Sequence, residues 1–304
     1  MFTHTRYPIG AKDNEISKKN LTFVLILSLK ISSMGNSVKR VLFVNSEIFP
    51  YLPETEIANI GRYLPQGIQE RKKEIRSFMP RYGCINERKN QLHEVIRLSG
   101  MNIVINDVDR PLVIKVASIS AARMQVYFID NEDYFHRKSI YHDENGEFFK
   151  DNGERAAFFA RGVLETVKKL RWAPDVIVCN GWISHVLPLY LKKAYKDDPI
   201  FSNSKVVLSL FEDTPAEFGE ELKDKIRYAG IGNEDLEVLS ESTGINLAKL
   251  AANYSDAIVF GSANIPQELM DYCNGLGLPV LPYNAAAMED GSYIEDYNNF
   301  YDQL

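Results

Sequence analysis

The sequence predicts a single α/β domain built on a doubly wound, mainly parallel sheet. Of its 304 residues, 45% are hydrophobic and 25% are charged, as in ordinary globular proteins. Short apolar runs alternate with amphipathic segments along the chain, which is the pattern of parallel strands connected by helices. A chain of this length can also bury a large core without disulfides or metal ions. These three observations favour one large sheet covered by helices on both faces.

Six apolar runs are short enough, and bounded sharply enough, to be buried strands. In chain order they cover residues 40–45, 74–79, 125–129, 175–179, 205–210 and 256–260. Five further segments are expected to be helical, namely residues 57–72, 155–170, 183–195, 248–254 and 266–273. The first of these helices shows the spacing clearly, because Ile57, Ile60, Leu64 and Ile68 fall on one helical face. Sheets of this kind bind ligands at the carboxyl ends of their strands.

Composition excludes several classes of function. The chain has 35 Lys and Arg against 41 Asp and Glu, a net charge of -6, whereas nucleic-acid-binding domains are usually basic. Its cysteines, Cys84, Cys179 and Cys273, form no CxxC pair, so we expect neither a zinc ribbon nor a disulfide framework, and a cytoplasmic location. The histidines do not cluster, and no glycine-rich dinucleotide or P-loop motif is present. We therefore expect no metal and no cofactor.

The two ends of the chain differ from its middle. Residues 1–33 hold one apolar run, far shorter than the ~20 residues of a membrane span, and no membrane association is expected. We interpret them as an extension that is disordered or precedes the true start at Met34, with an export signal as the alternative. Residues 285–304 carry five acids, no base and four aromatic residues. We expect a solvated acidic tail there, the alternative being a segment that docks its aromatic residues on a partner or on its own domain.

Six motifs follow one another in an order and spacing that resemble a known family. They are SEIFPY (46–51), FMPRYG (78–83), YFIDN (127–131), GERAAFF (153–159), PDVIVCNGW (174–182) and KDDPIFSNSKVV (196–207). In this register they resemble the N-terminal domain of bacterial glycogen synthases and plant starch synthases. The resemblance covers about residues 39–281, and we expect the domain to occupy residues 34–284.

The resemblance implies one half of a GT-B fold, in which two Rossmann-like domains face each other across a cleft. Such enzymes transfer glucose from ADP-glucose to the end of an α-1,4-glucan with retention of configuration. The N-terminal domain supplies mainly the acceptor side, and the C-terminal domain supplies the donor nucleotide site. The family pattern ends here near Leu281. We therefore expect the donor domain to be absent from this chain.

The loop after the first strand departs from the family. Where the family has Lys-Thr-Gly-Gly, this chain has Pro53, Glu54, Thr55 and Glu56. Glycines at a helix N-terminus let backbone N–H groups reach a phosphate, and the lysine would neutralise it. A carboxylate about 5 Å from a phosphate charge instead costs about 3 kcal/mol at an effective dielectric of about 20. The glutamates also suit the first turn of a helix, so both interpretations can hold.

Two more positions depart from the family. Its His-Asp-Trp becomes Asn180, Gly181 and Trp182, and its later His-Asn becomes Phe211 and Glu212. The histidine that contacts the reacting glucose is thereby replaced by a phenyl ring, and one lost transition-state donor typically costs ~10²–10³ in rate. Trp182 can belong either to the core or to the wall of the acceptor site.

These departures predict a catalytically impaired descendant, a pseudoenzyme that binds a glucan, another carbohydrate or a protein partner. One alternative is the acceptor half of a synthase made of two chains, and another is a structural or regulatory subunit that associates with a protein partner or forms a homo-oligomer. We expect no confident catalytic residue, because the family positions are replaced at Pro53, Thr55, Glu56, Asn180, Gly181 and Phe211. The candidate binding residues in the cleft are Glu54, Glu56, Tyr82, Asn180, Trp182, Glu212 and Asp213.

Overall fold

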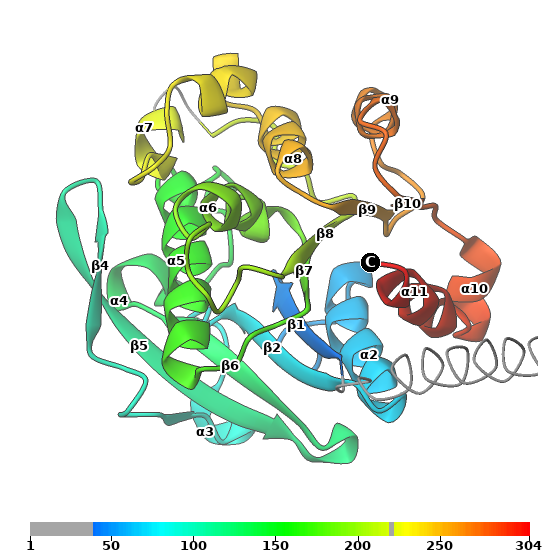
Figure 1. The fold of residues 1–304 in the computed structure, drawn as a ribbon. Helices are drawn as coiled ribbons and strands as arrows, with labels where there is room; N and C mark the ends of the chain where they lie inside the picture. The colour runs from blue at the N-terminus through cyan, green and yellow to red at the C-terminus, as the bar shows by residue number, and fades with distance from the viewer. Residues whose placement is uncertain (1–38, 219–221) are drawn as a thin grey trace, which may run out of the picture. The chain divides into compact units, whose positions relative to one another are not determined.

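A ten-stranded sheet organises the chain in the computed structural model, which describes residues 39–218 and 222–304 (Figure 1). Along the sheet the strands are β10 (Val280–Leu281), β9 (Ala257–Phe260), β8 (Lys205–Leu210), β7 (Val176–Asn180), β1 (Arg40–Asn45), β2 (Glu74–Pro80), β6 (Met124–Asp130), β5 (Val108–Ile119) and β3 (His93–Glu94), with β4 (Met101–Ile105) paired to β5. From β10 to β6 all neighbours pair in parallel. The predicted doubly wound, mainly parallel sheet is confirmed. The expected extension at residues 1–33 lies outside the described residues.

Strands β3, β4 and β5 were not predicted. They form an antiparallel extension in which β5 pairs with β6, β4 and β3. The tight connection between β4 and β5 places Asn106 and Asp107 at positive φ values of 50° and 61°, the backbone that a two-residue hairpin needs. Such turns usually carry glycine, which is absent here, so the sequence signal of the hairpin is weak.

Helices cover both faces of the sheet because successive residues of each strand point in opposite directions. Leu42 and Val44 of β1 join one core, while Val41 and Phe43 join the other. The first core is closed by α5 (Asn152–Leu170), the 3-10 turn η2 (Trp182–Ser184), α6 (Leu187–Lys193), α8 (Gly244–Asn253) and α9 (Gln267–Gly275). The second is closed by α2 (Glu56–Glu70), α10 (Ala285–Asp290) and α11 (Tyr293–Asp302) (Figure 1).

Shorter elements complete the fold, and one predicted helix is divided. The short elements are η1 (Ser120–Ala122), α3 (Glu87–Asn90), α4 (Glu132–Phe135), α7 (Leu222–Ile226) and η3 (Glu234–Ser240). The helix expected over residues 183–195 consists of η2 followed by α6, which has Pro188 in its first turn, where a proline is tolerated. Within the described ranges, no helix combines the length and apolar character needed to cross a membrane.

The interpretation of residues 285–304 as a solvated tail is wrong. These residues form α10 and α11, and the aromatic side chains Tyr293, Tyr297, Phe300 and Tyr301 are buried against β1 and α2. Their spacing places them along one helical face. The acids pair with bases near the end of α2, since Arg71 contacts Glu295 at 2.8 Å and Lys73 contacts Asp302 at 3.0 Å. The alternative, docking on its own domain, describes the structure.

Candidate functional site

The loops at the carboxyl ends of β1, β7, β8 and β9 lie next to one another because these strands are neighbours in the sheet. The register brings Asn45 of β1 level with Asn180 of β7, and Asn180 level with Ser209 of β8. The amide of Asn180 donates to Oδ1 of Asn45 at 2.8 Å, and the backbone N–H of Ser46 donates to the carbonyl of Asn180 at 2.8 Å. These bonds fix the starting points of the loops that follow. We call the four loops together the loop edge (residues 46–59, 181–186, 211–217 and 261–266).

Thr55 organises the loop after β1. Its hydroxyl accepts a hydrogen bond from the backbone N–H of Ala58 at 3.0 Å and donates to Oε2 of Glu47 at 2.8 Å. Thr55 is thus the N-cap of α2, and Glu56 is the acid of the first turn. Pro53, Glu54, Thr55 and Glu56 are all exposed, so this segment does not fill the interior.

Burial raises the pKa values of two acids in this loop. It raises the pKa of Glu47, although the hydrogen bond from Thr55 lowers it. It also raises the pKa of Glu56, with a lowering contribution from a hydrogen bond to Ser262 and a raising one from the charge of Glu212. Glu47 was not among the predicted site residues. Its signal was available, because it is a carboxylate two residues after a strand at the ligand-binding edge.

Asp213 occupies space that the glycine at position 181 leaves open. Gly181 has a φ of +84°, and a Cβ there would lie 2.2 Å from Oγ of Ser46 and 2.8 Å from Oδ2 of Asp213. Oδ2 accepts a hydrogen bond from the backbone N–H of Trp182 at 2.8 Å, whereas Oδ1 is buried without a partner among the described residues. Burial raises the pKa of Asp213 to about 7, opposed by that hydrogen bond and reinforced by the charge of Glu47. The carboxylate therefore titrates near neutral pH.

Several predicted binding residues are inaccessible. Asn180 and Tyr82 are fully buried and Trp182 is 1% exposed. The hydroxyl of Tyr82 donates to the carbonyl of Ser46 at 3.2 Å, and its other contact is the hydroxyl of Tyr141 at 3.0 Å. Of the two roles considered for Trp182, the structure shows the core role. These rings offer no face to a sugar.

A cover of aromatic residues explains the burial of Trp182. Its ring lies 4.8 Å from that of Tyr141, 5.5 Å from that of Phe148 and 5.3 Å from that of Phe218. Tyr141 and Phe148 belong to the segment that leads into α5. Their closure over the tryptophan depends on contacts far apart in the sequence, which periodicity alone does not reveal.

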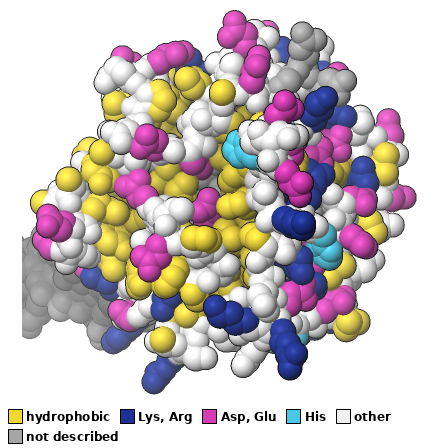
Figure 2. Space-filling model, turned by 180° about the vertical axis from the view of Figure 1, so that it is seen from behind, with side chains coloured by type: hydrophobic (Ala, Val, Ile, Leu, Met, Phe, Trp, Pro, Cys, Tyr) yellow, Lys and Arg dark blue, Asp and Glu magenta, His cyan; other side chains and the backbone are white. Residues whose placement is uncertain are grey.

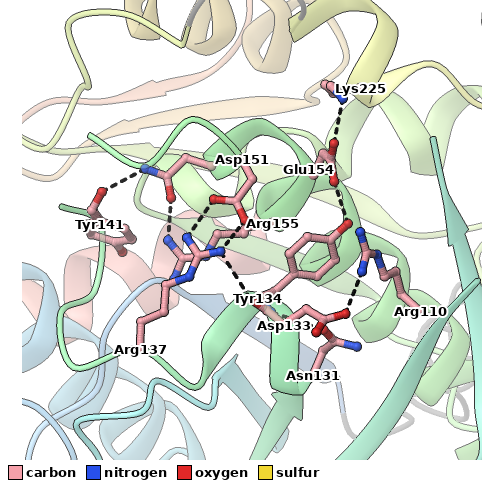
Figure 3. Close-up of polar contacts among 11 residues, drawn as sticks. Arg110, Asn131, Asp133, Tyr134, Arg137, Tyr141, Asp151, Glu154, Arg155 and Lys225 are labelled. Atoms are coloured by element: carbon pink, nitrogen blue, oxygen red, sulfur yellow. Dashed lines mark hydrogen bonds and ion pairs between the residues drawn. The ribbon is translucent and has the colours of Figure 1, made fainter. Parts of the chain in front are cut away.

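Polar contacts at the start of α5 hold this cover in place (Figure 3). Arg155 is fully buried and donates to the side chain of Asn152, whose amide donates to the carbonyl of Tyr141 at 2.9 Å. Nearby, Arg137 donates to Oδ1 of Asp151 at 2.7 Å. The arginine of the GERAAFF motif is therefore linked, through Asn152, to the segment that covers Trp182.

Phe211 also lies below the surface of the loop edge. It is 2% exposed and shares a core with Ile57 and Ile60 of α2. A Cβ at Gly261 would lie 2.5 Å from its ring, so the ring packs directly on that backbone. The position at which the resemblance implies a histidine is thus occupied by a core side chain. Glu212, its neighbour, is exposed and accepts from the amide of Asn264 at 2.8 Å.

The loop edge is acidic and contains no Lys or Arg. Its carboxylates are Glu47, Glu54, Glu56, Glu212, Asp213 and Glu217. On the face shown in Figure 2, acidic side chains lie among hydrophobic ones across the centre of the view, and many Lys and Arg side chains lie towards its lower and right margins. In the part of the chain that the structure describes, no group of three or more His, Cys, Asp or Glu is arranged to hold a metal ion. Carboxylates of this kind can accept hydrogen bonds, and their negative charge is unfavourable for anions.

The fold is that of a GT-B glycosyltransferase domain. It is similar to the catalytic domain of starch synthase IV from Arabidopsis thaliana bound to ADP and acarbose, with a TM-score of 0.58 and 15% identity over 73% of this chain and 45% of that one. The family described as "Starch synthase catalytic domain" matches residues 40–281, and the chain belongs to this family.

Bacterial glycogen synthases are among its relatives in sequence. That of Chlorobium limicola is 32% identical over 255 residues, which are 78% of this chain and 52% of the relative. That of Chlorobium luteolum is 38% identical over 172 residues, or 56% of this chain and 35% of the relative. The chain thus spans at most about half the length of these two relatives. The resemblance found in the motifs is confirmed.

Proposed function

We propose that this domain binds a neutral α-glucan and does not by itself transfer glucose from ADP-glucose. The observation that carries the proposal is the loop edge, which holds six carboxylates and no Lys or Arg. Neutral sugars present hydroxyl groups, which donate hydrogen bonds that carboxylates accept well. A sugar nucleotide presents a diphosphate, whose charges such an edge repels.

The magnitude of this repulsion favours the neutral ligand. One carboxylate about 5 Å from a phosphate charge costs about 3 kcal/mol at an effective dielectric of about 20, before salt screening. Glu54 and Glu56 are both exposed in the loop where the family has a phosphate-binding lysine and glycines. Because both side chains are exposed, solvent screening reduces this cost, and the two acids together still disfavour the binding of a diphosphate.

The buried aromatic residues change which groups would contact the glucan. Tyr82 and Trp182 are enclosed, so the contacts fall to exposed carboxylates, chiefly Glu54, Glu56 and Glu212. A two-chain synthase is less well supported, because an acceptor half working with a separate donor half should retain the lysine of the first loop.

Two measurements on the full chain test the proposal. We expect titration calorimetry with maltoheptaose to give binding in the millimolar range, and the same titration with ADP-glucose to give no heat. We also expect no incorporation of labelled glucose from ADP-glucose into glycogen above a protein-free control. Incorporation by the purified chain would overturn the loss of transfer, and absence of maltoheptaose binding would overturn the glucan assignment.

A pair of matched variants locates the effect. Glu54→Gln and Glu56→Gln keep the size of each side chain and remove its charge, so each should weaken maltoheptaose binding. Glu94→Gln is the control, because Glu94 is exposed on β3 and does not belong to the loop edge. Equal effects of all three variants would show that the loop edge is not the binding surface.

A further inference from the structure

A groove beside the loop edge is built partly from residues beyond the family match. It runs between α2 and the segment formed by α10 and α11, and has a volume of about 510 Å³. The family match ends at residue 281, before α10 begins. Small-molecule sites typically have about 300–1,000 Å³ and combine an apolar lining with a few polar groups. This groove has both properties.

Tyr63 is the aromatic residue of the groove that is most open to a ligand. It is 44% exposed, although large apolar side chains elsewhere on α2, such as Ile60 and Leu64, are buried. The guanidinium of Arg62 lies 5.2 Å from the centre of its ring. The guanidinium contacts one face of the ring, and the opposite face is left for a ligand. The apolar C–H face of a pyranose is a suitable partner for such a ring face.

The polar groups of the groove complement sugar hydroxyls. Glu56, Glu289 and Asp290 supply carboxylates, Asn59 supplies an amide that can both donate and accept, and no Lys or Arg lines the groove. Asp290 is held in place, because its Oδ1 accepts from the backbone N–H of Ser292 at 2.8 Å. An arrangement of carboxylates and an amide around an exposed ring can bind vicinal hydroxyl groups while the ring covers the apolar face of the sugar.

We propose that this groove is an α-glucan subsite in which Tyr63 stacks on a glucose unit and Glu56, Asn59 and Glu289 bind its hydroxyls. The inference rests on the proposed function and deepens it, since Glu56 belongs both to the groove and to the loop edge. One glucan can therefore contact both surfaces. A neutral ligand is favoured over a phosphorylated one by the same carboxylates.

The test uses the full chain and maltoheptaose in titration calorimetry. Tyr63→Ala should weaken binding about five- to tenfold, whereas Tyr63→Phe, which retains the ring, should bind like the parent. Glu289→Gln should also weaken binding, and Glu94→Gln on β3 is its matched control. Hydrogen exchange supplies a second measurement, since maltoheptaose at a concentration near the Kd of the parent should protect residues 56–63 and 288–294 more strongly in the parent than in Tyr63→Ala.

The outcomes separate this inference from the proposed function. If the parent does not bind maltoheptaose, both fail. Suppose that the parent binds maltoheptaose, that Tyr63→Ala and Glu289→Gln bind it as tightly as the parent, and that it does not protect residues 288–294 of the parent from hydrogen exchange. The proposed function then stands and the groove assignment is overturned. If the groove instead binds basic peptides, a lysine-rich amphipathic probe peptide should bind with strong salt dependence, and Tyr63→Ala should leave maltoheptaose binding unaffected. That result would also overturn the groove assignment. Binding of maltoheptaose that is insensitive to salt and is weakened about five- to tenfold in Tyr63→Ala supports it.

Discussion

Tyr301 provides a quantitative test of how the last helix is held. Its side chain is fully buried in the second core, at an edge-on contact with Phe43 of β1 (ring centres 6.4 Å apart) and another with Tyr297 (6.1 Å). Its hydroxyl is buried without a hydrogen-bond partner among the described residues. The ring should therefore stabilise the fold while the hydroxyl opposes it.

Two substitutions separate these contributions. Tyr301→Ala removes the ring and leaves a cavity, and truncations of this kind cost about 3–5 kcal/mol. Tyr301→Phe keeps the ring and removes only the unpaired hydroxyl. Because an unsatisfied buried polar group costs about 1–3 kcal/mol, the phenylalanine variant should be as stable as the parent or more stable by about 1 kcal/mol.

Urea unfolding followed by circular dichroism measures both effects, and unchanged m-values would show that the same two states are compared. Glu94→Gln is the control, because Glu94 is exposed on β3 and such a surface substitution should change the free energy of unfolding by no more than about 0.5 kcal/mol. A loss below about 1 kcal/mol in Tyr301→Ala would refute the packing of α11 on β1. A clear destabilisation in Tyr301→Phe would refute the statement that the hydroxyl lacks a partner.

Three further substitutions test the loop edge. Asp213→Asn should change how stability depends on pH. The pKa of Asp213 is raised to about 7 in the folded state from 3.8, so the parent loses stability as the pH rises through this interval. The free energy of unfolding of the variant minus that of the parent, measured in urea, should therefore be larger at pH 8 than at pH 5 by on the order of 2 kcal/mol. Thr55→Ala removes the N-cap of α2 and should cost about 1 kcal/mol, while Thr55→Ser should cost much less by the same assay. Trp182→Ala should lower the free energy of unfolding by about 3–5 kcal/mol as a core truncation. In the fraction that remains folded, calorimetry should give an unchanged affinity for maltoheptaose. A loss of affinity without a loss of stability would instead place Trp182 in the binding site.

The central strands could be predicted because each is a short apolar run whose burial is dictated by its own residues. Residues 40–45 and 205–210 are strands with the predicted bounds. The last helix was missed because its acids suggested a solvated tail. The spacing of Tyr293, Tyr297 and Phe300 already described one helical face, and what the sequence did not show was the surface available for that face to cover.

The environment of the candidate residues was harder to predict than the loops that carry them. The loop edge follows from strand order, and strand order follows from the alternation of strands and helices. Whether Trp182 is a wall or a core residue depends on Tyr141 and Phe148, which are more than 30 residues away in the sequence and are positioned through Arg155. Burial that is imposed by a distant segment leaves no periodic signal at the residue itself.

The carboxyl group of Asp213 lies beside the end of β7, and this too could not be predicted from the sequence, because Asp213 is about 30 residues away from that strand end. Position 181 carries a glycine, and considered alone this indicates the loss of an acid. In the fold, Oδ2 of Asp213 lies 2.8 Å from where a Cβ of residue 181 would stand and binds the backbone N–H of Trp182. This carboxyl group is thus supplied by the loop that follows β8, and the space it needs exists only because residue 181 has no side chain. Asp213 thus adds a carboxylate to the loop edge beside the exposed Glu54 and Glu56 of the first loop, and the proposed preference for a neutral ligand rests on these acids together.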